Sequence, residues 1–302
     1  MGHGIAQIFL AGGHEVALHD PNPEILADAP EKIRSIFELL EQDNSGFNKL
    51  ACHATLAEAV QHADFVIEAG PEKLEIKQEI FRQLSDLTKP SAILATNTSA
   101  IPIRQISDGV ADRSRVVGTH FWNPPYLVRL VEVVQSEATA VSAIERTICL
   151  LERVAMKSVH VKRDIPGFIG NRLQHAMKRE AISLVADGVC DAETIDTVVK
   201  HGFGSRLAVL GPMEQSDLVG LNLTLNIFEV LFPSLNNAST PPPLLVDKVA
   251  KGELGMKSGR GFREWTPESA ARVRREMQEF LLKQAKADIN NRSKVGGPEN
   301  GN

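Results

Sequence analysis

The amino-acid sequence predicts an α/β domain with a parallel, doubly wound sheet, followed by an all-α domain. In the first half, short apolar runs alternate with amphipathic helical periods. From Phe168 onward helical periods dominate, and the segment 164–167 (Asp-Ile-Pro-Gly) marks the boundary. We therefore expect domains at residues 1–163 and 164–287, and a disordered tail, rich in Asn, Gly and Lys, at 288–302.

The predicted strands are runs of a few mostly apolar residues, as expected for strands buried in a parallel sheet. They are residues 16–19, 65–67, 92–96, 116–119, 130–134 and 158–161. The predicted helices show apolar residues at helical spacing. In the first half they are residues 24–42, 75–87, 103–107 and 145–155, after a first helix that opens at the N-terminus. In the second half they are residues 171–186, 192–200, 214–231, 244–251 and 268–287.

Composition excludes several classes of protein. The chain has 302 residues, of which 43% are hydrophobic, with a net charge of −5 and no basic stripe, so we expect no nucleic-acid partner. No apolar run is long enough to span a bilayer, and no secretory signal opens the chain, so we expect no membrane association. Three widely spaced cysteines without a CxxC motif argue against disulfides and favour the cytoplasm. The nine histidines show no ligand spacing, so we predict no metal.

The N-terminus resembles part of a dinucleotide-binding motif. In such βαβ units a GxGxxG sequence joins the first strand to the first helix, and an acidic residue about 20 positions later binds the ribose hydroxyls. Here Gly2 would be the third glycine and Asp20 the acidic residue, which would favour NAD over NADP. The alternative is that Asp20 is a turn residue before Pro21.

The first strand and the first two glycines of this motif are absent from the sequence. In the complete unit that strand is central in the sheet, so its absence should leave a gap and expose the edges of two strands. We hypothesise that Met1 is an internal methionine of a longer natural chain.

His120 and Glu132 form the most informative pair. The sequence predicts a strand that closes at His120, a sharp proline turn, and a returning strand that contains Glu132. Such a return can place the carboxylate against one imidazole nitrogen and leave the other free to take a proton from an alcohol. The alternatives are a turn histidine bound to backbone and an exposed strand carboxylate.

With these residues identified, the chain resembles the L-3-hydroxyacyl-CoA dehydrogenase family up to about residue 265. The resemblance implies a Rossmann-type doubly wound sheet, here without its first strand, followed by a helical domain that supplies a homodimer interface. The matching motifs occur in order: Met1-Gly2-x-Gly4-Ile5-Ala6, Asn97-Thr98-Ser99, His120-Phe121-x-Asn123-Pro124, Leu130-Val131-Glu132-Val133, Pro166-Gly167-Phe168-Ile169-x-Asn171-Arg172, Gly211-Pro212, Asp217-x-Val219-Gly220-Leu221 and Lys257-Ser258-Gly259-x-Gly261-Phe262.

The resemblance also implies catalytic roles. His120 would be the general base, and Glu132 would fix its tautomer. Ser99 would hydrogen-bond the substrate oxygen, unless it is the N-cap of the following helix. Asn171 would polarise the substrate carbonyl, unless it serves as a cap or a domain contact. Cofactor contacts are implied for Gly2, Asp20, Glu72, Lys77, Ser99, Asn123 and Lys257; for Lys77 the alternative is a solvated helix face.

Arg206 is a departure from the family pattern, since the hydroxyacyl-CoA enzymes usually carry neutral residues there. A guanidinium could bind a substrate carboxylate in bidentate fashion, or form a surface or interdomain salt bridge. The resemblance therefore implies NAD-dependent, reversible oxidation of a 3-hydroxyacyl-CoA. The alternatives are a dehydrogenase of a free 3-hydroxy acid, bound by Arg206, and a non-catalytic NAD-binding relative.

Overall fold

The computed structural model describes residues 1–295. The chain forms two compact units: residues 1–172 together with the chain from Met277, and Leu173–Glu276. The sequence-based division between residues 163 and 164 assigned the whole last helix to the second domain, whereas its C-terminal part packs with the first unit.

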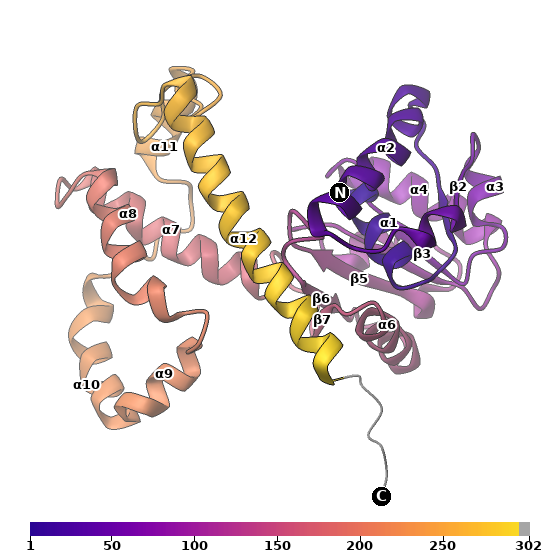
Figure 1. Ribbon diagram of the computed structural model, residues 1–302. Helices are drawn as coiled ribbons and strands as arrows, with labels where there is room; N and C mark the ends of the chain where they lie inside the picture. The colour runs from indigo at the N-terminus through magenta and orange to yellow at the C-terminus, as the bar shows by residue number, and fades with distance from the viewer. Residues whose placement is uncertain (296–302) are drawn as a thin grey trace, which may run out of the picture. The chain divides into compact units, whose positions relative to one another are not determined.

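The first unit alternates helices and strands, as Figure 1 shows. Its strands are β1 (Val16–Leu18), β2 (Leu50–Cys52), β3 (Phe65–Glu68), β4 (Ile93–Thr96), β5 (Val116–Phe121), β6 (Leu130–Val134) and β7 (Lys157–Val161). Its helices are α1 (Gly2–Ala11), α2 (Pro23–Leu40), α3 (Leu56–Val60), α4 (Leu74–Leu87), α5 (Ile103–Ile106) and α6 (Val141–Arg153). Short 3-10 turns cover Ser45–Lys49 and Arg113–Arg115.

Strands β3 to β7 form one sheet in sequential order. Strands β3, β4 and β5 are parallel, β6 is antiparallel to β5, and β7 is parallel to β6. Successive side chains of each strand point to opposite faces of the sheet. One apolar cluster joins the sheet to α1 and α6, and another joins it to α3, α4 and α5. The predicted class, a Rossmann-type α/β unit followed by helices, is confirmed.

The sheet is divided at the position of the expected gap. β1 pairs with β2 in a separate parallel sheet, and no pairing joins β1 to β3 within the described residues. The edges of β1 and β3 are therefore unpaired on the sides that a further strand would occupy. A small core beneath α1 and α2, centred on Leu10, Ile33 and Phe37, holds the β1–β2 sheet in place.

The prediction missed β2 and α3, which lie between residues 42 and 65. β2 has three residues and only one large apolar side chain, Leu50, so it carries no detectable period. α3 is marked by a capping box, in which the Thr55 hydroxyl accepts from the Glu58 amide and the Glu58 carboxylate accepts from the Thr55 amide. That pattern was available in the sequence.

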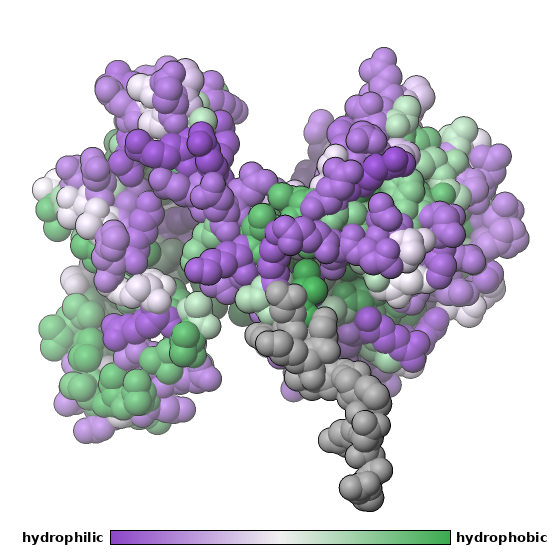
Figure 2. Space-filling view, in the orientation of Figure 1, coloured by the Kyte–Doolittle hydropathy of each residue, from purple (hydrophilic) through white to green (hydrophobic). Residues whose placement is uncertain are grey.

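The second unit is helical. It contains most of α7 (Gly170–Ala186), α8 (Ala192–His201), α9 (Pro212–Val219), α10 (Leu221–Leu231), α11 (Pro243–Ala250) and the first part of α12 (Pro267–Val295), with 3-10 turns at Phe203–Arg206 and Phe232–Ser234. Figure 2 shows apolar residues gathered on this unit, over the region where Figure 1 draws α9 and α10.

Two helix predictions in this half need correction. The single helix predicted at 214–231 is wrong, because Gly220 adopts a φ of 94° and separates α9 from α10. The last helix was predicted to end at Ala287 but continues to Val295. The remainder of the predicted disordered tail, residues 296–302, lies outside the described residues.

Candidate active site

The site is centred on His120 and Glu132, which lie directly opposite each other on the antiparallel strands β5 and β6. Opposed residues of an antiparallel pair point to the same face of the sheet. The Nδ1 atom of His120 lies 2.8 Å from Oε2 of Glu132, and the two residues are 5% and 1% exposed. The predicted pairing is confirmed, and both alternatives for these residues are excluded. The turn between the strands contains a cis peptide bond, Asn123–Pro124.

The second oxygen of Glu132 is also occupied. Oε1 accepts hydrogen bonds from the backbone N–H groups of Ile169 and Gly170, at 2.9 and 3.0 Å. Burial by itself raises the pKa of Glu132, but the hydrogen bonds from His120, Gly170 and Ile169 outweigh it and leave the pKa below its usual value. Glu132 is therefore ionised at neutral pH and accepts from Nδ1–H, so that Nε2 is the acceptor nitrogen in the neutral form of the ring.

Aromatic side chains enclose the imidazole. The rings of Trp122 and Phe168 each lie 5.7 Å from the His120 ring, between centroids. Phe168 is fully buried with a φ of 51°, and this turn aims the next two N–H groups at Glu132. A Cβ at Gly170 would lie 2.3 Å from the ring of Trp122, so any other residue there would displace that ring. The two N–H groups were missed because backbone donors carry no residue-type signal.

Ser99 and Asn171 are brought together. The side-chain amide of Asn171 donates to the carbonyl oxygen of Ser99 at 2.9 Å. The Ser99 hydroxyl is exposed and has no hydrogen-bond partner within the described chain. Ser99 is not an N-cap, since α5 follows Pro102 and its first amides donate to Asp164 instead. The hydroxyl is thus available to a ligand.

Glu72 and Lys77, predicted as cofactor contacts, both bind neighbouring protein groups. Lys77 is fully buried, and its ammonium group lies 2.9 and 3.0 Å from the two oxygens of Glu68. The alternative of a solvated face is therefore wrong for Lys77. The Glu72 carboxylate accepts three hydrogen bonds from the turn that carries Ser99.

Asp20 and Gly2, which the resemblance implies as cofactor contacts, lie after the end of β1 and at the start of α1. Asp20 lies just beyond β1 and borders a cavity of about 310 Å³ that is otherwise lined by apolar groups and Cys52. A Cβ at Gly2 would meet no atom within 4 Å, so the N-terminus of α1 is open to a ligand. Free N–H groups at a helix N-terminus attract phosphate. Asp20 would hold the ribose hydroxyls and the first turn of α1 the pyrophosphate.

The remaining predicted residues lie as follows. Asn123 is exposed in the turn after β5, directly before the cis-proline. Lys257 is exposed in the segment between α11 and α12 of the helical unit. Arg206 ends a 3-10 turn, is exposed, and makes no ion pair with any described residue, so the salt-bridge alternative finds no support among them.

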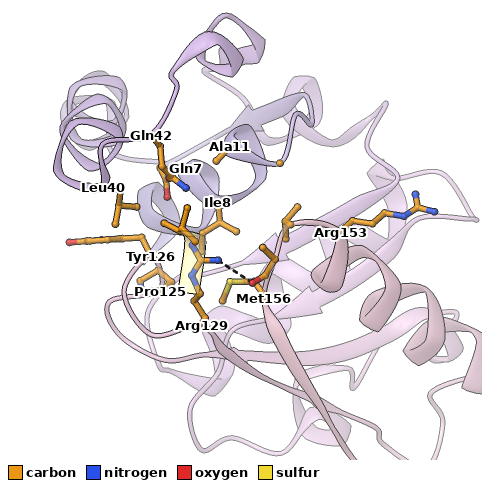
Figure 3. A pocket seen from close by; sticks show the side chains of 14 residues that line it. Gln7, Ile8, Ala11, Leu40, Gln42, Pro125, Tyr126, Arg129, Arg153 and Met156 are labelled. Carbon is orange, nitrogen blue, oxygen red and sulfur yellow. Dashed lines mark hydrogen bonds between the residues drawn. The ribbon is translucent and has the colours of Figure 1, made fainter. Parts of the chain in front are cut away.

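A second cavity, of about 210 Å³, is lined by none of the predicted site residues. It is bordered by α1, the turn after Pro124 and the segment before β7; Figure 3 shows Arg129 at its centre, donating to the Ala155 carbonyl oxygen.

Among the described residues no group of His, Cys, Asp or Glu side chains could hold a metal ion, and the absence of a metal stays a prediction. None of the described helices is both long and apolar enough to span a bilayer.

A buried histidine–carboxylate pair within a Rossmann-type α/β unit is typical of an NAD-dependent oxidoreductase. Family models agree. Residues 1–165 match the NAD-binding domain of 3-hydroxyacyl-CoA dehydrogenase, and residues 167–265 match the C-terminal domain of the same enzyme. The chain belongs to the 3-hydroxyacyl-CoA dehydrogenase family, and its cofactor is NAD.

Relatives in this family differ in substrate. The chain is 33% identical to 5-formyl-3-hydroxy-2-methylpyridine 4-carboxylate 5-dehydrogenase of Mesorhizobium japonicum, over 93% of each chain. It is 38% identical to a probable 3-hydroxybutyryl-CoA dehydrogenase of Bacillus subtilis, over 88% of this chain and 94% of that protein. A crystal structure of the former kind of enzyme, an NAD+-dependent dismutase, superposes with a TM-score of 0.89 at 31% identity, covering 96% of this chain and 95% of that one.

Proposed function

We propose that this protein catalyses reversible hydride transfer between NAD and the C3 carbon of a 3-hydroxyacyl-CoA. The buried His120–Glu132 pair carries the proposal, because it leaves Nε2 as a general base in an NAD-binding protein. The CoA thioester is supported by the family and by the 3-hydroxybutyryl-CoA relative.

In the proposed mechanism, Nε2 of His120 removes the proton of the substrate hydroxyl. The ionised Glu132 stabilises the imidazolium that forms and keeps the ring in its orientation. The Ser99 hydroxyl donates to the substrate oxygen, and the Asn171 amide, held by the Ser99 carbonyl, polarises the thioester carbonyl. Bound NAD, held by Asp20 and the first turn of α1, would supply the hydride acceptor. In ketone reduction, His120 returns the proton as an acid.

A second candidate is a dehydrogenase of a free hydroxy acid. The exposed guanidinium of Arg206, without an ion-pair partner among the described residues, could bind a carboxylate through two parallel hydrogen bonds. The pyridine carboxylate dehydrogenase, which matches this chain over nearly its whole length, supports this candidate. A third possibility, a non-catalytic NAD-binding relative, is disfavoured by the intact His120–Glu132 pair.

The two substrate classes are distinguished by following NADH oxidation with acetoacetyl-CoA and, in parallel, with free acetoacetate. Turnover of the thioester supports the first candidate. Arg206→Ala should then leave turnover within about twofold of the unaltered protein, like the control Arg274→Ala on an exposed stretch of α12. If only the free acid reacts, Arg206→Ala should lower kcat/KM by about a hundredfold, and the control Arg274→Ala should not. This is the loss expected when a hydrogen bond to a charged group is removed.

We also propose that the helical unit forms a homodimer. Apolar residues of α9 and α10 are largely exposed, with Leu218 at 71%, Leu221 at 64% and Val230 at 76%. An apolar patch of this kind on one unit is typical of a surface that binds a partner.

We further propose a cytoplasmic location. All three cysteines are free, as expected for a protein in a reducing compartment.

A further inference from the structure

The turn that carries Ser99 is held by a single carboxylate oxygen. Oε1 of Glu72 accepts a hydrogen bond from the hydroxyl of Thr98 at 2.6 Å and from the amides of Ser99 and Ala100 at 2.9 and 3.1 Å. Three donors from consecutive residues converge on one acceptor. Glu72 itself lies outside this turn, between β3 and α4, so it ties two separate segments together.

Glu72 is anchored from the opposite side. Its Oε2 lies 3.6 Å from the ammonium group of Lys77, which is fully buried and held by Glu68. Glu68 in turn accepts from the Thr96 hydroxyl at 2.7 Å and from the Gly70 amide. One buried cation therefore lies between two carboxylates, and both carboxylates bind the end of β4 or the turn after it.

The same turn contacts the rest of the site. The side-chain oxygen of Asn97 accepts from the amide of Phe121, the residue after His120, at 2.9 Å. The carbonyl of Ser99 accepts from Asn171. A displacement of this turn would therefore move the Ser99 hydroxyl and release the Asn171 amide.

We propose that Glu72 is a positioning residue of the reaction: its carboxylate fixes the turn at residues 97–100, and through it Ser99 and Asn171, relative to His120. This inference rests on the proposed function. This role acts through the protein and is distinct from the cofactor contact that the resemblance implies for Glu72. Lys77 serves the same end by holding Glu72 in place.

The charge state of Glu72 agrees with this role. Partial burial raises its pKa, but the hydrogen bonds from Thr98, Ser99 and Ala100 and the charge of Lys77 bring the pKa below its usual value. The carboxylate is thus ionised, and its three hydrogen bonds are charge-assisted, at neutral pH.

The test compares Glu72→Ala and Glu72→Gln with the control Glu75→Gln, an exposed carboxylate in the first turn of α4. Glu72→Ala should lower kcat by about tenfold to a hundredfold, as expected when reacting groups are misplaced. Its Kd for NADH, from fluorescence titration, should change by less than about threefold. Glu72→Gln keeps an acceptor oxygen and should recover most of kcat. Glu75→Gln should match the unaltered protein.

Amide hydrogen exchange provides a readout that needs no turnover. In Glu72→Ala the peptide covering residues 97–101 should exchange faster, and in Glu75→Gln it should not. Exchange that stays unchanged in Glu72→Ala would overturn the proposal. So would a rise in the NADH Kd as large as the fall in kcat, because that result indicates a direct cofactor contact. If the unaltered protein turned over no substrate, the proposed function would fail, and the exchange result would still decide whether Glu72 fixes the turn.

Discussion

At the scale of single residues, both carboxylate oxygens of Glu132 accept hydrogen bonds from groups of the protein itself. One oxygen accepts from His120 and the other from two backbone amides of the Pro166–Gly170 turn. A buried carboxylate satisfied on both oxygens is held rigidly and favours its ionised form. This rigidity keeps the imidazole in one tautomer, and it links the active-site strands to the start of α7.

The lowered pKa of Glu132 predicts how stability depends on pH. When the pKa of a carboxyl group is lower in the folded than in the unfolded protein, its ionised form stabilises the folded state. This stabilisation is complete at pH values above the pKa in the unfolded protein, about 4.3 for Glu. That contribution is lost as the pH falls through the lower folded pKa. Glu132→Gln should thus lower the free energy of unfolding by about 3 kcal/mol at pH 7, measured by chemical denaturation. The difference should shrink in the acid range, whereas Glu137→Gln, at an exposed site, should have little effect at any pH. If the difference in the free energy of unfolding between Glu132→Gln and the unaltered protein stayed constant down to acid pH, the proposed role of the Glu132 charge would be wrong.

The pairing of His120 with Glu132 was predictable because a short turn joins their strands. Two adjoining strands with a tight connection fix the register locally, and only the side-chain identities were needed. The roles of Glu72 and Lys77 were not predictable in the same way. Their partners, Thr98 to Ala100 and Glu68, depend on how two parallel strands align, which no local sequence pattern reports.

At the scale of elements, α9 and α10 form a broken helix with an exposed apolar surface. Gly220 stops α9 with a backbone conformation that other residues rarely adopt, and α10 restarts immediately at Leu221. Apolar periodicity runs through the break, so periodicity alone predicted one helix. A positive φ at Gly220 is a tertiary property that the glycine permits but does not dictate.

This surface gives a prediction for assembly. Leu221→Glu, which places a charge within the apolar surface of α10, should convert the proposed dimer to a monomer, because an unpaired charge is costly to bury at an interface. Val141→Glu on α6 is a matched control, since Val141 is 62% exposed and Leu221 is 64%. Mass measured by light scattering during gel filtration reports the outcome. A monomeric unaltered protein, or an unchanged dimer in Leu221→Glu, would refute the proposed interface.

The last helix, α12, shows how an element can extend beyond the family pattern. The matched C-terminal domain ends at residue 265, just before α12 begins at Pro267. Its C-terminal part belongs to the first unit, where Ala285 packs with Ile36, Leu40 and Leu127, and Lys286 pairs with Glu41. Leu127 lies in the turn between β5 and β6, so α12 supports the segment that joins His120 to Glu132.

At the scale of the whole molecule, the fold was predictable because strand and helix periods alternate so regularly in the first half. The helical character of the second half was also predictable from its periods, but the break at Gly220 was not. What the sequence left open is the substrate, since relatives of similar identity are named as dehydrogenases of a CoA thioester or of a pyridine carboxylate. The proposed general base, His120, is the same for both substrate classes.

The most direct test is hydride transfer from NADH in His120→Gln, measured in a single turnover with acetoacetyl-CoA and with acetoacetate beside the unaltered protein. Glutamine approximates the size of the imidazole but cannot transfer a proton, so the rate should fall by about a hundredfold or more. NADH binding, titrated separately, should be unchanged. A His120→Gln variant that kept the full rate would contradict the account.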